Sequence, residues 1–260
     1  MLRNIKTYHR PTKVEDAVSL VQSSANAAYL GGGAWLTAQG DPKLEVAVDL
    51  QDVGIDVLEG DIEAVRIGAM ATLQEIIDHD DAGKLANGVL AKAAGLTQSR
   101  NLREQGTLGG ALIVAGSADP LTTVLLVLDG EIFYADPTGH SAPFASFVAY
   151  RDRLIKACAL LTEVRVKRPP TRSAAAYEVV GRSPKDKPIV GAAAYVEVEE
   201  GLAAKVRLAV GGADAKPVRL LKAEHLLKDT LLSKTDIDAA LRPALAQLDP
   251  IGDFRGSPEY

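Results

Sequence analysis

The sequence predicts an α+β protein built from two or three compact units. Its 260 residues exceed what one hydrophobic core usually holds. In the first two thirds, short apolar runs alternate with segments of helical spacing, whereas in the last third successive strand-like runs precede helical ones. The paired prolines of Lys167–Thr171 stop both a helix and a strand ladder, and so mark a linker. We therefore expect units at 1–56, 57–170 and 171–260.

The first unit is expected to contain a small β-α-β arrangement. Thr12–Glu15 has the capping-box pattern that starts a helix, and apolar residues then recur at helical spacing. The apolar run Ala27–Leu30 predicts a strand that ends abruptly at Gly31–Gly33, with a short helix from Ala34. Val46–Leu50 predicts the next strand, at a separation that suits a crossover connection.

The second unit mixes helices and strands around a polar loop. Thr72–Glu75 is a second capping box, and Asp119 before Pro120 fits a helix start with Asp as the N-cap. Between them, Ser99–Gly110 is a polar segment that tightens into glycines. The other expected elements are strands at 64–67, 131–135 and 160–166, a helix at 85–96 and a turn at 136–139.

The third unit is expected to be an antiparallel sheet followed by helices. Strands are predicted at Ala174–Val180, Ile189–Glu199 and Ala204–Val210. Glu200-Gly201 suits a tight hairpin turn between the last two, of a type that the sequence leaves open. Asp236–Gln247 is the clearest of the helices that follow.

Composition narrows the classes of partner and compartment. The net charge is −5 and the basic residues are spread along the chain, so nothing favours nucleic acid or an anionic membrane. The apolar run Leu121–Leu128 is too short to span a bilayer. Met1–Arg10 lacks the apolar core of a secretion signal. The expected compartment is the cytoplasm, with export beside a signal-bearing subunit as the alternative.

The chain has few residues for chemistry of its own. Cys158 is its single cysteine, so it cannot form a disulfide, an iron–sulfur cluster or a cysteine-rich zinc site by itself. Its histidines are not in metal-ligand spacing, and no nucleophile elbow, phosphate-binding P-loop or GxGxxG fingerprint occurs. We therefore expect no catalytic side chain and no metal, with the chemistry coming from a cofactor or a partner.

Two glycine-rich loops have a composition that suits a pyrophosphate. Gly31–Gly33 lies between a predicted strand and a predicted helix, and Gly106–Gly110 adds the hydroxyl of Thr107. Glycines let a backbone approach a ligand closely and point successive N–H groups into a concave anion site. Either loop alone is more typical of a plain turn. Because both loops occur in one chain, a bound dinucleotide and two plain turns are equally good interpretations.

Five segments, in order along nearly the whole chain, carry a family resemblance. Gly31–Leu36 resembles the first flavin loop of molybdenum-hydroxylase flavoproteins, and Arg103–Ala111 is similar to the second. Tyr8–Pro11, Leu160–Val164 and Asp253–Tyr260 resemble the opening, middle and C-terminal signatures. The chain thus resembles the FAD-binding medium subunits of molybdenum hydroxylases, such as carbon monoxide dehydrogenase, and the flavin domain of xanthine dehydrogenase.

The resemblance implies a two-subdomain FAD-binding fold of the PCMH and vanillyl-alcohol-oxidase type, with a small α+β C-terminal domain. It implies an oxidoreductase subunit whose FAD receives electrons from 2Fe–2S centres on a small subunit and passes them to NAD, a quinone or another acceptor. A molybdopterin large subunit would complete the complex, as a dimer of heterotrimers. The residues expected to bind FAD are Gly31, Gly32, Gly33, Ala34, Trp35, Leu36, Arg103, Thr107, Gly109, Gly110, Ala111, Asp119, Thr123, Leu161, Asp186 and Lys187.

Four of these residues depart from the family pattern. Trp35 replaces a small polar residue, Ala111 an asparagine and Thr123 an acidic residue, while Lys187 stands where carbon monoxide dehydrogenases have a tyrosine. In one interpretation Trp35 walls the flavin while glycine amides hold the pyrophosphate. In the alternative the chain is a structural paralogue without flavin. A stand-alone flavin oxidase is a third possibility, less favoured because the third unit is short.

Overall fold

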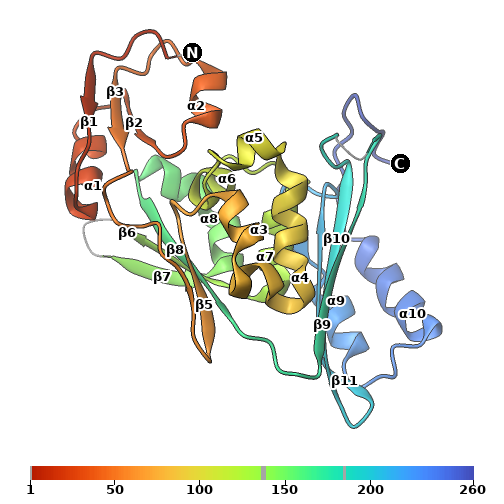
Figure 1. The fold of residues 1–260 in the computed structure, drawn as a ribbon. Coiled ribbons are helices and arrows are strands. Elements are labelled where there is room, and N and C mark those ends of the chain that lie inside the picture. Colours follow the sequence, from red (N-terminus) through yellow and green to blue (C-terminus); the bar gives the residue numbers. More distant parts are fainter. Residues whose placement is uncertain (1, 136–138, 184–185) are drawn as a thin grey trace.

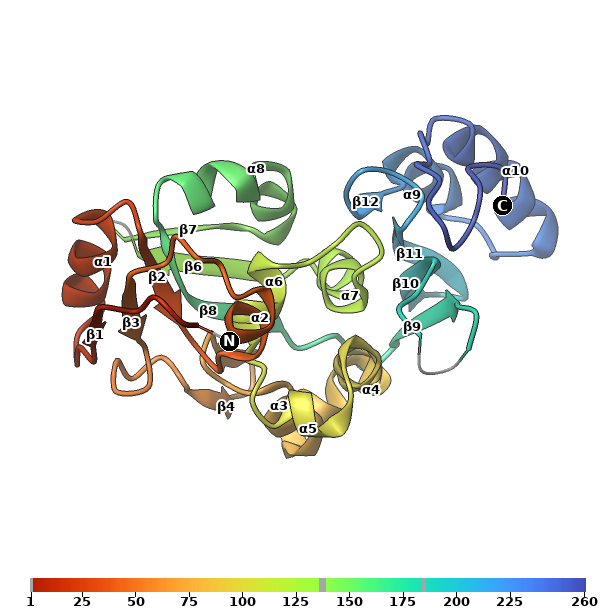
Figure 2. The ribbon, with the colours of Figure 1, turned by 90° about the horizontal axis from the view of Figure 1, so that it is seen from above.

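The computed structural model describes residues 2–135, 139–183 and 186–260. Three β-sheets follow one another along the chain, and a group of helices lies between the second sheet and the third (Figure 1). Seen from above, the N-terminal sheet and the C-terminal helices lie at opposite ends of the molecule (Figure 2).

The N-terminal sheet has three parallel strands in the order β1-β3-β2: β1 (Thr7–His9), β2 (Ala27–Leu30) and β3 (Val46–Asp49). Helix α1 (Val14–Gln22) packs its apolar face against this sheet, and α2 (Ala34–Gln39) connects β2 to β3. The predicted β-α-β arrangement is confirmed. The predicted capping box is wrong, because Lys13 is the N-cap and makes no side-chain capping bond.

The second sheet is antiparallel, with the strand order β4-β5-β8-β6-β7. Its strands are β4 (Leu58–Gly60), β5 (Ala64–Gly68), β6 (Glu131–Ala135), β7 (His140–Pro143) and β8 (Leu160–Lys167). The three strands expected here are confirmed, whereas β4 and β7 are additional. Of the turn expected at 136–139, all but Gly139 lies outside the described residues.

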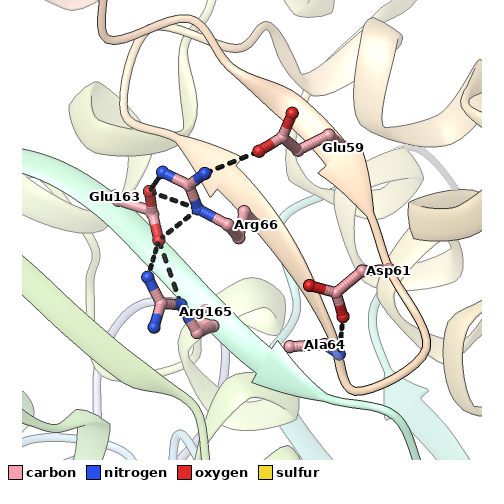
Figure 3. A network of polar contacts seen from close by, with 6 residues as sticks. All are labelled: Glu59, Asp61, Ala64, Arg66, Glu163 and Arg165. Carbon is pink, nitrogen blue, oxygen red and sulfur yellow. Dashed lines mark hydrogen bonds and ion pairs between the residues drawn. The ribbon is translucent and has the colours of Figure 1, made fainter.

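Charged side chains join three strands on one face of this sheet. Arg66 of β5 bonds Glu59 of β4 at 2.6 Å and Glu163 of β8 at 2.6 Å, and Arg165 reaches the same Glu163 carboxylate at 3.1 Å (Figure 3). Burial of Glu163 alone would raise its pKa, but the hydrogen bonds from both arginines outweigh burial and lower the pKa of this carboxyl. Each charge is thus paired within the sheet.

Helices cover the other face of the second sheet. They are α3 (Leu73–Asp78), α4 (Asp80–Thr97), α5 (Arg100–Arg103), α6 (Leu108–Ile113), α7 (Pro120–Leu128) and α8 (Phe144–Lys156). The capping box at Thr72 and the N-cap at Asp119 are confirmed. The helix expected at 85–96 is only partly correct, because Ala86, Asn87 and Gly88 adopt left-handed conformations that interrupt α4. Every residue of α7 is buried, so this helix forms the centre of the molecule.

The third sheet is antiparallel, and helices pack on both of its faces, although the strand Ser173–Val180 leaves alternate residues exposed. Its order is β12-β11-β10-β9, from β9 (Ser173–Val180), β10 (Val190–Glu199), β11 (Leu202–Gly211) and β12 (Val218–Arg219). One face packs on α4 and α7, and the other on α9 (Leu221–Leu227) and α10 (Lys234–Leu245). Positive φ at both Glu200 and Gly201 identifies their hairpin as a type I′ turn.

The three sheets occupy residues 7–49, 58–167 and 173–219. The expected boundaries between the three units, after residue 56 and after residue 170, stay predictions. Within the described residues, no helix combines the length and apolarity needed to cross a bilayer.

Candidate cofactor site

The first glycine loop presents unpaired backbone amides. Gly33, between β2 and α2, is left-handed at φ 72°, and Ala34 then begins a right-handed helix. Successive left- and right-handed residues point their N–H groups to the same side, which forms an anion-binding nest. Within the described part of the chain, the amides of Gly32, Gly33 and Ala34 donate to no protein acceptor. This loop therefore offers several donors to an external anion.

The second glycine loop uses most of its amides internally. Leu108 N–H donates to the Ala71 carbonyl at 2.9 Å, and Gly109 N–H donates to the Ala69 carbonyl at 2.8 Å. The Gly110 amide donates to Oγ1 of Thr107, the N-cap of α6, at 3.2 Å. These donors are unavailable to a phosphate in this conformation.

The two loops pack directly on each other. A β-carbon at Gly32 would lie 1.4 Å from the carbonyl oxygen of Gln105, and one at Gly31 would lie 3.0 Å from Thr107 Oγ1. The second loop is therefore the surface on which the first loop rests.

A cleft of about 650 Å³ lies next to these loops, and all three parts of the chain line it. Trp35, 48% exposed, comes from α2, and Ala111 comes from α6. Asp119 lies at the start of α7, while Asp186 and Lys187 come from the β9–β10 connection. The structure thus brings together five of the residues expected to bind FAD.

Asp119 combines a structural role with a place in the cleft. Its Oδ1 accepts hydrogen bonds from the backbone amide and the hydroxyl of Thr122, both at 2.7 Å. Burial raises the pKa of this carboxyl, although the Thr122 hydrogen bonds and the charges of Arg151 and Lys187 act in the opposite direction. The cleft therefore holds a carboxyl group that retains its proton to a higher pH than usual.

Several expected residues lie elsewhere. Arg103 donates to the carbonyls of Gly95 and Gln98, at 3.0 and 2.7 Å, and so fixes the end of α4. Thr123 is fully buried, faces Gly211 of β11 and donates to the Asp119 carbonyl, because its helix packs against the third sheet. Leu161 is a core residue of β8. None of these three side chains lines the cleft.

The remaining expected residues belong to the loops. Leu36 is half-buried on α2, and Thr107 and Gly109 are buried within the second loop. A β-carbon at Gly109 would lie 2.9 Å from that of Ala69, so this glycine allows close packing.

The cleft also has walls that our expected FAD-binding residues omit. They are Leu96, Thr97 and Gln98 at the end of α4, the segment 114–118, Pro120, Arg182, Pro188, Phe254 and Arg255. Phe254 and Arg255 belong to the C-terminal signature, so that signature could have identified them as residues of the site. The 114–118 segment had no comparable signal.

Comparison with known proteins identifies the family to which this fold and cleft belong. The family model of the FAD binding domain in molybdopterin dehydrogenase matches residues 3–170, and that of the CO dehydrogenase flavoprotein C-terminal domain matches residues 175–260. The uncharacterized protein YgfM of Escherichia coli (strain K12) is 31% identical, with 98% of this chain and 90% of YgfM covered. The carbon monoxide dehydrogenase medium chain of Afipia carboxidovorans is 29% identical, with 97% of this chain and 90% of that chain covered.

A solved structure shares the whole fold. Carbon monoxide dehydrogenase from Hydrogenophaga pseudoflava aligns with a TM-score of 0.92 at 24% identity, covering 100% of this chain and 93% of that chain. Together with the two family matches, this establishes the predicted FAD-binding fold with its C-terminal domain. The chain therefore belongs, as an oxidoreductase subunit, to the FAD-binding family of the molybdopterin dehydrogenases, a family whose cofactor is FAD.

Proposed function

We propose that this chain is the electron-transferring FAD subunit of a molybdenum-containing dehydrogenase. It receives electrons from 2Fe–2S centres on a small partner subunit and passes them to NAD, a quinone or another acceptor. When bound, FAD supplies the redox chemistry. One observation supports this function most strongly: the amides of Gly32, Gly33 and Ala34, unpaired within the part of the chain that the structure describes, lie beside a cleft lined by three parts of the chain.

The residues present fit FAD in two respects. An anion nest at Gly33 is suited to a pyrophosphate, and backbone donors do not depend on the side chains that depart from the family pattern. The cleft offers about 650 Å³ and an exposed indole face at Trp35, which suit a planar ring. We assign the pyrophosphate to the nest and the flavin ring to the cleft, with Ala111, Asp119, Asp186 and Lys187 among its walls.

The partners follow from the same proposal. The Afipia carboxidovorans relative is the medium chain of a carbon monoxide dehydrogenase. The Hydrogenophaga pseudoflava structure is of a carbon monoxide dehydrogenase that lacks the Mo-pyranopterin moiety of the molybdenum cofactor. Cys158 is the single cysteine of this chain, which cannot ligate a 2Fe–2S cluster by itself. A small iron–sulfur subunit and a large molybdopterin subunit therefore complete the complex, as a dimer of heterotrimers.

A structural paralogue without flavin is the second candidate. Two features of the cleft favour it: Trp35 places an indole where a small polar side chain is usual, and Ala111 contributes no polar group. In this alternative the chain holds its partners together and carries no electrons.

Titration of the purified chain with FAD separates the candidates. For the electron-transferring subunit, we expect either co-purified yellow flavin or saturable uptake of added FAD by calorimetry. A colourless protein that releases no heat with FAD supports the structural paralogue. In the purified complex, substrate should bleach the flavin absorbance after the iron–sulfur signal changes, and an unbleached flavin would refute the proposed electron path.

A further inference from the structure

The C-terminal segment Gly252–Tyr260 folds into a compact unit against the cleft. Asp253 and Gly256 exchange backbone hydrogen bonds at 3.0 and 3.2 Å, which close a tight turn. A β-carbon at Gly256 would lie 2.9 Å from the ring of Tyr260 and 3.5 Å from Ile189, so this turn packs on the β9–β10 connection. Phe254 and Arg255 then line the cleft.

Arg255 links this turn to the β9–β10 connection. Its Nη1 donates to the Pro188 carbonyl at 2.8 Å. Its Nε and Nη2 donate to Oδ2 of Asp253 at 2.8 and 2.6 Å, so the ion pair orients the guanidinium. Only the planar fork of arginine can make both contacts in one conformation.

Pro188, whose carbonyl Arg255 holds, directly follows Lys187 in the chain. Lys187 lines the same cleft as Asp119, at the start of α7, and its positive charge acts to lower the pKa of that carboxyl. Lys187 therefore carries a positive charge at the wall of the cleft.

We propose that Arg255 is a positioning residue for the FAD site: by holding the Pro188 carbonyl, it keeps the ammonium group of Lys187 facing the cleft. This inference rests on the proposed flavin position. A fixed positive charge there favours the reduced, negatively charged flavin over the oxidised one, and so raises the midpoint potential. The C-terminal signature is then part of the cofactor site.

A double-mutant cycle on the FAD-loaded full chain tests the link. We expect Arg255→Ala to lower the midpoint potential by about 30 mV, which equals a tenfold change in the relative affinities for reduced and oxidised flavin. Lys187→Ala should lower it at least as much. Because Arg255 itself lines the cleft, the charge-preserving change Arg255→Lys is used for the cycle: in the Lys187→Ala background it should change the potential no further, since its effect acts through Lys187.

Two further variants separate positioning from folding. Arg255→Lys can keep only one of the two contacts and should recover part of the potential, with an unchanged unfolding temperature. Arg242→Ala, an exposed arginine on α10 of the same domain, is the matched control and should leave the potential unchanged. If Arg255→Ala does not fold, Arg255→Lys replaces it in the test. Its shift of the midpoint potential should then disappear in the Lys187→Ala background.

The outcomes are distinguishable. Additive shifts for Arg255 and Lys187, or a potential insensitive to Arg255, overturn the inference while the proposed FAD site stands. Failure of the wild-type chain to bind FAD overturns the proposed function itself.

Discussion

The two glycine loops have similar compositions, but the structure uses their backbones differently. In the loop at 31–33 and the residue after it, the amides of Gly32, Gly33 and Ala34 have no acceptor among the described residues. Gly33 adopts a left-handed conformation that only glycine tolerates well. In the loop at 106–110, the amides of Gly106, Leu108 and Gly109 are bonded to carbonyls, and that of Gly110 is bonded to the Thr107 hydroxyl. A glycine cluster can therefore serve ligand binding or backbone packing, and only the location of nearby acceptors separates the two.

The difference assigns each loop a distinct contribution to FAD binding. The first loop supplies the donors, and the second supplies the rigid surface that shapes it through Gln105 and Thr107. Substitutions should consequently alter affinity directly in the first loop, and mainly alter stability in the second.

Gly32→Ala should have the largest effect. Its β-carbon would overlap the Gln105 carbonyl, at 1.4 Å, so the loops must separate. Overpacking of this kind costs roughly 1–3 kcal/mol or more. We expect FAD affinity to fall by more than about 100-fold, or roughly 2.7 kcal/mol, in calorimetric titration.

Gly95→Ala is the matched control for this substitution. A β-carbon at Gly95, inside α4, would meet no atom within 4 Å, and alanine favours a helix. Its FAD affinity should equal that of wild type. Equal affinities for Gly32→Ala and Gly95→Ala would show that the contact between the loops does not shape the site.

A comparison of Gly33→Ala with Gly110→Ala tests whether the first loop binds FAD while the second loop serves packing. Alanine at the left-handed Gly33 costs roughly 1–2 kcal/mol, and relaxation of that strain would flatten the nest. We expect about tenfold weaker FAD binding, which is about 1.4 kcal/mol. At Gly110 φ is not positive and the amide is already bonded, so the change should stay within about twofold.

The reverse order would contradict the comparison. If Gly110→Ala weakened FAD binding more than Gly33→Ala did, with unfolding temperatures equal for both, the second loop would be the phosphate site.

Trp35→Ser should have a smaller effect. Trp35 is half-exposed on the cleft, and stacking of a ring on an aromatic side chain contributes roughly 1–3 kcal/mol. At the low end of that range, loss of the indole weakens FAD binding about fivefold. Trp35→Phe should retain most of the affinity. Tighter binding by Trp35→Ser would instead show that the indole obstructs the cleft.

Most of the fold could be predicted from local signals. The strands 27–30 and 131–135 have the bounds expected from their apolar runs, and the N-caps Thr72 and Asp119 start helices as their side chains dictate. Helix α8 was not predicted, because Pro143 precedes it and provides no capping side chain. The capping pattern at Thr12 was misleading, since the chain stays extended through Lys13.

The cofactor site could be predicted only in part. The first loop could be identified because its glycines lie between a strand and a helix, a position that suits an anion. The acceptors that occupy the second loop belong to Ala69 and Ala71, which folding brings close from a distant part of the sequence. Likewise, Thr123 turns away from the cleft because α7 packs on the third sheet, a fact of tertiary structure.

Thr107 gives the smallest expected change in affinity and separates the two roles most directly. Its hydroxyl caps α6 and is buried beside Gly31, so Thr107→Val should cost about 1 kcal/mol of unfolding free energy. Thr107→Ser keeps the cap and should be close to wild type by thermal unfolding. Because the first loop supplies the donors, FAD affinity of folded Thr107→Val should stay within about twofold of wild type. A tenfold loss at a temperature where the variant is fully folded would mean that this hydroxyl donates to the pyrophosphate, and that both loops bind it.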